Sequence, residues 1–414
     1  MATDAARVQA ETPGVSGPSP NAWRAISAWG LAAIIFLLAR GFDPQYSMFW
    51  VFGLAFGFVL QRGRFCFASA FRDLFLLGHG RTMKGVLLGL AVASVGFGIV
   101  MARQVPVTTM GFDPPSANVL PIGVHTALGG IFFGVGMVLA GGCVSGSLYR
   151  MGEGYVASWV AFAGVMAGLL VSAYTWSWWW ESSISTGARL WLPRHLGHSG
   201  ALVVTLLALG AAFVWVIRLE HRAGMVVPAP RSEPEVSEGV ADDLRALGRT
   251  VFVRGWPVVT AGAVLGGLNA LLFTAQEPWG FTGEVGRLTV GLAGFFGATP
   301  PPPEGVGSLP GCVLVPWTGV LDHMTFMVGG MWLGSFAAAL GAGEFKLRVP
   351  KRPVRYAQSL GGGVVMGYGS GIAMGCTIGA FFSGIPSLAI NGWLFAAFLG
   401  LGAWMGTHMI RRIA

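Results

Sequence analysis

Charged residues and cysteines are both scarce in this sequence. Asp, Glu, Lys and Arg make up only 11% of the 414 residues, whereas a soluble domain usually has about 25%. The four cysteines are too few for a disulfide scaffold, and the chain contains no CxxC pair and no GxxxxGK[ST] loop. These absences argue against an ordinary cytosolic enzyme, a thioredoxin-like or zinc site, and a chain that hydrolyses ATP through a phosphate-binding loop.

Apolar residues are abundant instead. They make up 54% of the chain, the mean hydropathy is +0.65, and 65 residues are glycine. Apolar stretches recur from end to end with lengths close to the roughly 20 residues that a helix needs to cross a bilayer. The sequence therefore predicts an all-α, polytopic membrane protein. The candidate spans are Ala25–Ala39, Tyr46–Gln61, Lys84–Ala102, Gly123–Gly142, Tyr155–Ala173, Ala201–Ile217, Trp256–Phe273, His323–Ala342, Gln358–Gly375 and Leu388–Ile410.

The basic residues predict how the chain is oriented. The net charge is +8, and the Lys and Arg residues lie mainly in the short loops between spans. If both termini are on one side, that side collects all of the 26 basic residues except Arg40, Arg103, Arg189, Arg194 and Arg287. The positive-inside tendency then places both termini in the cytoplasm of a bacterium, with the spans in its inner membrane. Membrane orientation and contact with lipids explain these loops without nucleic acid.

Two polar stretches divide the chain into four segments. We expect a disordered cytoplasmic tail over residues 1–21 and a first membrane half over 22–218. A cytoplasmic linker over 219–254, with a short helix at Val240–Leu247, then leads to a second membrane half over 255–414.

One internal repeat stands out. Gly129–Gly146 and Gly362–Gly379 share the pattern GG, three residues, G, one residue, G, five residues, GC, two residues, G, without a gap. With both termini inside, the two copies cross the membrane in opposite directions. The duplication therefore predicts two inverted repeats around a central pore, which is the architecture of proteins that open a site to each side in turn. A transport function follows.

The end of each copy predicts a broken or re-entrant helix. A Gly-Cys pair is followed three residues later by another glycine, and a short helix starting there would present amides and a positive dipole end to an anion. Plain close packing of helices through small residues is the alternative explanation for these glycines. The candidate substrate-binding residues in the two copies are Gly142, Cys143, Gly146, Gly375, Cys376 and Gly379.

A third candidate cysteine, Cys66, lies in QRGRFCFASAFRD, residues 61–73. The arginines beside it, of which Arg64 is our binding candidate, could collect an anion at the cytoplasmic mouth or simply set topology and contact phospholipid. No cysteine has a histidine nearby at metal-ligand spacing, so we expect neither a metal nor a cofactor. His125, Glu153 and Asp322 lie near span ends, where we expect them at the interface.

These segments resemble the sulfur transport family of YeeE/YedE type. The likeness is carried by QRGRFCFASAFRD, GGCVSG and GCTIG, and it covers roughly Phe49–Phe162 and Trp256–Thr407; Gly63 stands where the family usually has serine. The resemblance implies a thiosulfate importer with an hourglass pore, in which cysteines pass the anion along by hydrogen bonds. It assigns that role to Cys66, Cys143 and Cys376, and implies a cytoplasmic sulfur carrier or sulfurtransferase as partner.

The chemistry of thiols suits this expectation. Thiosulfate is a dianion with a soft terminal sulfur, and a neutral thiol is a weak S–H donor with a soft sulfur of its own. Weak donors in series hold an ion loosely enough to release it. Two alternatives remain at this point. One is a thiol-based membrane enzyme, a sulfur relay or oxidoreductase in which Cys143 and Cys376 form a persulfide or disulfide. The other is a permease for a selenium compound or a soft metal.

Overall fold

The protein is helical throughout the part of the chain that can be described. The structure is a computed structural model, and it describes residues 22–108, 112–224, 248, 250–311 and 313–413. Regular structure in these ranges consists of helices, with three isolated bridge pairs. Nine of the described helices are long and apolar enough to cross a membrane, and a helix pair bent by 49° supplies a tenth candidate. These correspond to the ten predicted spans, which confirms the all-α polytopic fold.

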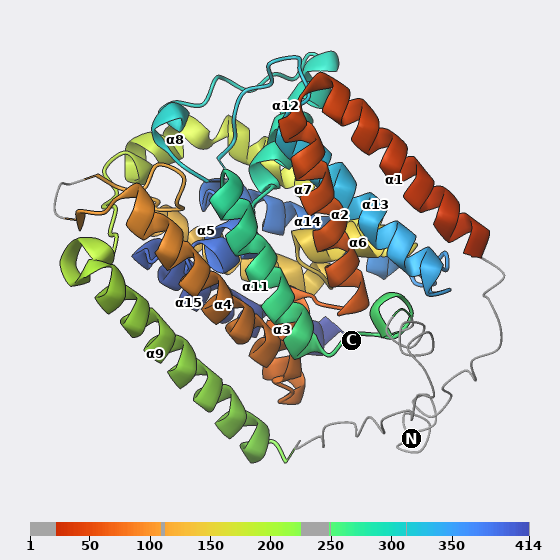
Figure 1. The fold of residues 1–414 in the computed structure, drawn as a ribbon, viewed down its shortest axis with the longest axis horizontal. Helices are drawn as coiled ribbons and strands as arrows, with labels where there is room; N and C mark the ends of the chain where they lie inside the picture. The colour runs from red at the N-terminus through yellow and green to blue at the C-terminus, as the bar shows by residue number, and fades with distance from the viewer. Residues whose placement is uncertain (1–21, 109–111, 225–247, 249, 312, 414) are drawn as a thin grey trace.

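The long helices form the bundle, and short helices follow five of them directly (Figure 1). The long ones are α1 (Ala22–Phe42), α2 (Pro44–Arg62), α4 (Arg81–Gln104), α5 (Val124–Ala140), α7 (Val156–Tyr174), α9 (Pro193–Arg222), α11 (Val258–Ala275), α13 (His323–Gly341), α14 (Pro353–Ile372) and α15 (Ile390–Ile413). The short ones are α3 (Phe67–Leu77) after α2, α6 (Val144–Gly152) after α5, α8 (Trp176–Trp179) with the π-helix η3 (Trp180–Ile184) after α7, α12 (Thr282–Phe295) after α11 and the π-helix η5 (Thr377–Ser383) after α14.

Helix packing follows a paired pattern. Helix α2 packs on α13 and α4 on α11, while α5 packs on α15 and α7 on α14; α5 and α14 pack on each other. The two halves of the chain have the same packing pattern. If α2 is exchanged with α11, α4 with α13, α5 with α14 and α7 with α15, the list of packed helix pairs stays the same. The outer helices obey the same exchange, because α1 packs on α13 and α9 on α4. The pattern is consistent with the two repeats that the duplication predicts.

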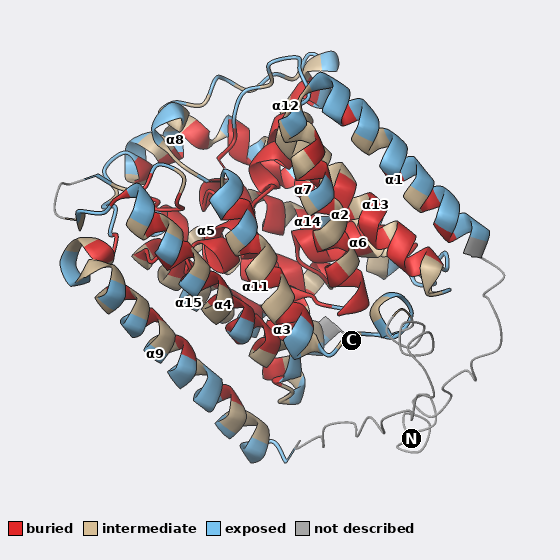
Figure 2. Ribbon diagram, in the orientation of Figure 1, coloured by how far each residue is buried: buried red, intermediate tan, exposed pale blue. Residues whose placement is uncertain are grey.

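The outermost helices present apolar side chains outward. Helices α1 and α9 lie at opposite edges of the bundle (Figure 1), and Figure 2 shows both mainly in the colour of exposed residues. Leu37 of α1 is 67% exposed and Leu207 of α9 is 68% exposed. In helices of this length, exposed leucines fit a surface that faces lipid rather than water.

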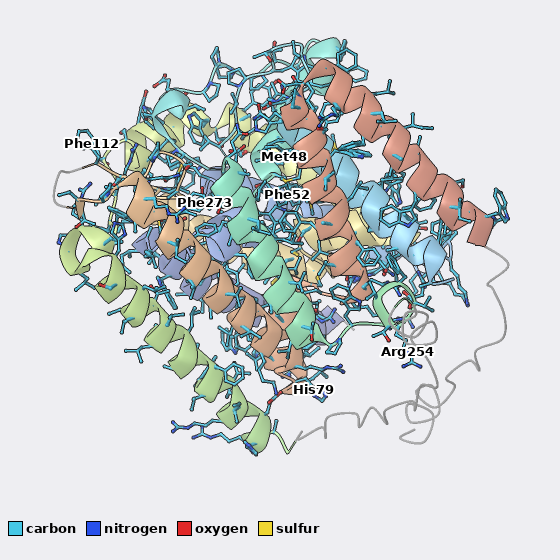
Figure 3. The ribbon with its side chains drawn as sticks, viewed as in Figure 1. Met48, Phe52, His79, Phe112, Arg254 and Phe273 are labelled. Atoms are coloured by element: carbon cyan, nitrogen blue, oxygen red, sulfur yellow. The ribbon has the colours of Figure 1, made fainter. Side chains whose placement is uncertain are left out.

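Aromatic and glycine contacts hold the long helices together. Phe273 of α11, labelled in Figure 3, stacks on Phe97 of α4 with ring centroids 4.2 Å apart. A Cβ atom at Gly168 of α7 would lie 2.1 Å from the carbonyl oxygen of Val364 on α14. Because lipid gives no hydrophobic drive for helix association, backbone contact of this kind matters in a bilayer. Close packing therefore explains many of the glycines within helices.

The structure adds two helices that we did not predict. Helices α3 and α12 have 11 and 14 residues, which is too short for a search based on spans. Helix α9 begins earlier than predicted and carries a kink at Gly197, where φ is 67°. The predicted tail, most of the predicted linker with its Val240–Leu247 helix, and Cys312 lie outside the described residues.

We predict that Gly168→Ala lowers the thermal unfolding midpoint of the detergent-purified protein. The added methyl group cannot fit against the α14 backbone, and overpacking of this kind costs about 2 kcal/mol. Gly210→Ala on α9 is the matched control, because a Cβ there meets nothing within 4 Å. It should leave the midpoint unchanged or raise it slightly. Equal midpoints for the two variants would contradict the close-packing explanation.

Candidate functional site

Three cysteines occupy the same local position. Cys66, Cys143 and Cys376 are the residues that immediately precede the short helices α3, α6 and η5. All three are free thiols with at most 1% of the residue exposed. Cys66 thus shares with Cys143 and Cys376 the position before a short helix. The helix breaks predicted beside the two Gly-Cys pairs are present.

Each break begins with a left-handed residue two positions before the cysteine. The φ angles are 46° at Arg64, 80° at Gly141 and 54° at Met374. For the two non-glycine residues this conformation costs on the order of 1 kcal/mol or more. The turn ends one helix and starts the next, so the cysteine comes to lie where the two meet.

Cys66 and Cys143 form a pair. Both sulfurs lie against Gly146, since a Cβ there would be 3.3 Å from Cys143 Sγ and closer still to Cys66 Sγ. The Cys143 sulfur also accepts the amide N–H of Gly146 at 3.3 Å and lies 3.3 Å from Ser145 Oγ. A Cβ at Gly146 would lie 2.6 Å from Cys66 Sγ. Gly146 is therefore required for the pair, whereas a Cβ at Gly142 would meet nothing closer than 3.6 Å.

A charged cavity lies beside α6, the short helix that Cys143 precedes. It has a volume of about 340 Å³, and we call it the Arg150 cavity; four basic side chains (Arg64, Arg150, Lys346, Arg348) and two acidic ones (Glu153, Glu344) line it. Arg150 lies on α6, donates from Nη1 to the Gly141 carbonyl at 2.6 Å and exerts its charge on the Cys66 thiol. In the sequence, Arg150 counts only among the basic residues that predict the orientation of the chain. The available signal was that it is the only Lys or Arg between Arg103 and Arg189.

Glu344 links the two arginines before Cys66. It accepts from the buried Arg62 at 2.7 Å and from Arg64 at 3.1 Å. Burial opposes ionisation of Glu344, but the two arginines and Gln61 outweigh it and hold its pKa below the ordinary value. The side chain of Arg64 is 73% exposed, so the structure places this candidate at the cavity mouth rather than beside the thiols.

Glu153 lies in the same cavity and not at an exposed interface. Burial raises its pKa, although the Gln61 amide and Arg150 favour the ionised form. Gln61 Nε2 donates to both carboxylates, at 3.2 Å to Glu153 and 2.7 Å to Glu344. Gln61 therefore links the two carboxylates, and Glu344 holds Arg62 and Arg64 in place.

Cys376 has a different set of neighbours. Its sulfur accepts the Ile378 amide at 3.3 Å and interacts with the Gly379 amide and with the Thr282 hydroxyl of α12. The Gly379 carbonyl accepts from Asn118 Nδ2 at 2.9 Å. A Cβ at Gly375 would lie 2.7 Å from the Ala380 nitrogen, so the chain needs glycine there.

A second charged cavity adjoins Cys376. It has a volume of about 370 Å³, and we call it the Arg287 cavity; its lining includes Asn118, Phe281, Gly283, Arg287 and His323. The two cavities lie at opposite ends of α13. His323 of the Arg287 cavity is the first residue of this helix, and Glu344 of the Arg150 cavity comes shortly after its last residue. A helix of 19 residues is about 28 Å long, close to the thickness of a bilayer core.

The structure separates Cys143 from Cys376. Helices α5 and α14 run antiparallel, because Gly129 of α5 lies against Ala373 and Gly136 lies against Gly362. Each cysteine follows the last turn of its helix, so the two lie toward opposite ends of the pair. Aromatic rings lie between these regions: Phe67, which follows Cys66, makes an edge contact with Phe382 of η5 at 5.2 Å.

Other features of the described residues do not form part of this site. They include no group of three or more His, Cys, Asp or Glu side chains that could hold a metal ion. An apolar cavity of about 420 Å³ borders α12 and the Pro300–Pro303 segment, and no charged side chain lines it.

Comparison with known proteins decides the family. The family model described as sulphur transport matches residues 62–405. The chain belongs to the sulphur transport family. The thiosulfate transporter TsuA of Spirochaeta thermophila is 33% identical over 374 residues, covering 87% of this chain and 98% of the relative. TsuA of Escherichia coli is 30% identical over 366 residues, covering 86% and 92%.

A shorter match is the probable transporter YedE of Escherichia coli, which is 33% identical over 187 residues and covers 45% of this chain and 44% of the relative. Together these matches confirm the predicted family. The names of the relatives support a multi-pass transport protein rather than an enzyme.

We predict that a mild oxidant joins Cys66 to Cys143 and that Gly146→Ala lowers the cross-linking yield several-fold. The added methyl group would lie against the Cys66 sulfur and push the thiols apart. The experiment uses a background in which Cys312 and Cys376 are serine. Intact mass reports the loss of two hydrogen atoms, whose electrons go to the added oxidant. Gly142→Ala is the control and should cross-link like the parent. The same yield for all three proteins would show that Gly146 does not set the distance between the sulfurs.

Proposed function

We propose that this protein takes up thiosulfate, or a closely related sulfur anion, across the bacterial cytoplasmic membrane, with both termini in the cytoplasm. The observation that carries the proposal is that three buried, free thiols each immediately precede a short helix at a helix break. The names of the two long relatives support thiosulfate as the substrate.

The proposed route runs through the cysteines in order. The anion enters the Arg287 cavity, reaches Cys376, passes to the Cys66–Cys143 pair and leaves through the Arg150 cavity. Two contacts support this order: Asn118 of the Arg287 cavity holds the Gly379 carbonyl beside Cys376, and Arg150 acts on the Cys66 thiol. The basic loops then place the Arg150 cavity on the cytoplasmic side.

Neutral thiols suit such a route. Burial disfavours the charged form of a thiol, and an uncharged thiol does not repel an anion. Each thiol offers a weak hydrogen-bond donor and a polarizable sulfur to the terminal sulfur of thiosulfate. Fixed arginines along the whole route would bind the dianion too tightly for release, and the described charges instead gather in the two cavities.

Arg150 and Arg64 take different roles in this proposal. Arg150 attracts the anion from the thiol pair into the cavity, and the exposed Arg64 adds to the positive field at the mouth. A cytoplasmic sulfur carrier or sulfurtransferase that consumes the anion would keep uptake moving inward; family resemblance alone suggests such a partner.

We predict that Cys143→Ala and Cys376→Ala each reduce uptake of radiolabelled thiosulfate at least tenfold. Each change removes one donor from the series and leaves a gap in the route. Immunoblots of isolated membranes should show normal protein levels, and intact mass of the wild type during uptake should show unmodified thiols. Uptake at the wild-type rate by the double variant would refute the cysteine route.

We also predict that Arg150→Gln reduces uptake about tenfold, while Arg150→Lys retains part of it. Glutamine keeps a donor for the Gly141 carbonyl but removes the charge beside Cys66. Arg222→Gln, at the exposed end of α9, is the control and should transport normally. If Arg150→Gln also transported normally, the charge of this residue would have no role in the route.

A further inference from the structure

His323, the first residue of α13, lies between two carboxylates, and we call these three side chains the His323 cluster. Its Nε2 lies 2.7 Å from Glu277 Oε1, and its Nδ1 lies 2.5 Å from Asp322 Oδ1. A neutral imidazole has one N–H group and one nitrogen lone pair, whereas an imidazolium has two N–H groups. A lone pair at either distance would be repelled by the carboxylate oxygen that faces it. The geometry therefore fits a cluster that holds one proton more than a neutral imidazole with two carboxylates.

Three elements hold the His323 cluster in place. Asp322 is the N-cap of α13 and accepts the His323 amide at 2.7 Å, within a capping box that includes Thr325. Glu277 follows the end of α11, and Phe49 of α2 makes an edge contact with the imidazole at 4.4 Å. The side chain of His323 is 19% exposed, and it lines the Arg287 cavity together with both carboxylates. The cluster can therefore exchange its proton with this cavity.

The lining of the Arg287 cavity has more negative than positive charge. Its charged or titratable side chains are Glu277, Glu284, Arg287, Asp322 and His323. Glu284 pairs with Arg287 at 2.7 Å, so the other two carboxylates are balanced only by the proton of the cluster. Loss of that proton makes the lining more negative. An anion that enters the cavity is therefore repelled less when the His323 cluster is protonated.

The other helices around α13 add no charge to this cavity. Helices α1, α2 and α6 pack on α13, and none of their described residues is part of the lining. Tyr46 of α2 donates its hydroxyl to the Leu321 carbonyl at 3.3 Å. The proton of the cluster is thus the change in charge that an anion in this cavity would meet near neutral pH.

A buried acceptor in the same lining also favours a protonated ligand. Asn118 is 1% exposed, and its Nδ2 donates to the Gly379 carbonyl at 2.9 Å. Its Oδ1 has no hydrogen-bond partner among the described residues. Buried polar atoms in native proteins are nearly always satisfied. An unpaired carbonyl oxygen needs a donor, so water or hydronium fits beside it and a bare anion does not.

We propose that the His323 cluster is a proton-binding site, and that the anion and the proton bind in the Arg287 cavity together. The anion binds more tightly when the cluster is protonated, and by linkage the cluster binds its proton more tightly when the anion is present. The proton comes from water and is held by a ring nitrogen or a carboxylate oxygen of the cluster. This inference rests on the proposed function for the identity of the anion, but not for the protonation of the cluster.

The pH dependence of thiosulfate binding tests the site. Equilibrium binding of radiolabelled thiosulfate to the purified full-length protein in detergent is measured between about pH 6 and about pH 9. Thiosulfate remains a dianion throughout this range, so the protein is the partner that titrates. The wild-type affinity should fall as the pH rises, by at most about tenfold for each pH unit, which is the limit for one linked proton. His323→Gln keeps a donor but does not titrate, so its affinity should change by less than about twofold over the range.

A second variant and a control make the test specific. Glu277→Gln removes one of the two carboxylates that favour the charged imidazole, so its affinity should begin to fall at a lower pH than in the wild type. His198→Gln is the matched control, because His198 on α9 is also partly buried and contacts the Val105 carbonyl at 2.8 Å, outside the cavity. It should show the wild-type pH profile.

The outcomes separate the proton site from the proposed function. A flat profile in the wild type, the wild-type profile in His323→Gln, or an equally flat profile in His198→Gln overturns the site even if the wild type takes up thiosulfate into proteoliposomes. Proton-linked binding that depends on His323, in a protein without uptake, supports the site and refutes the transport proposal. Absence of both thiosulfate binding and uptake overturns both.

Discussion

A helix interrupted inside a bilayer leaves amides and carbonyls that find no water, and this constraint governs the structure. The breaks lie where side chains supply the missing partners. Arg150 donates to the Gly141 carbonyl at 2.6 Å, and the sulfurs of Cys143 and Cys376 accept amides of the helices that they precede. Irregular backbone inside a bilayer persists only where protein groups satisfy it, and the residues that supply these partners are among those that we propose contact the anion.

Glycine makes the arrangement compact enough for that repair. Gly168 brings the backbones of α7 and α14 together, and Gly146 leaves room for two sulfurs that a methyl group would separate. Helix packing and site geometry thus draw on the same residue type for one reason, which is the absence of a Cβ. The glycine spacing allowed two explanations, a helix break beside the cysteine and close packing of helices, and the structure contains both at different positions.

The difference between the halves has a physical meaning. Near Arg150 the route has paired thiols beside a cavity with more basic than acidic side chains. Near Arg287 it has a thiol and a hydroxyl beside a cation whose charge is balanced by Glu284. The two ends of the proposed route would therefore bind the anion with different groups.

The order of residues was enough to predict the helical membrane fold, the ten spans, the family and the three candidate cysteines, because length, hydropathy and short motifs are local properties of the chain. It could not predict that Cys66 rather than Cys376 lies beside Cys143, or that Arg150 and Thr282 each adjoin a cysteine. Helices α3 and α12 carry no signal in hydropathy, and their neighbours come from distant segments. Those contacts depend on how antiparallel helices align at their glycines, which only the folded protein decides.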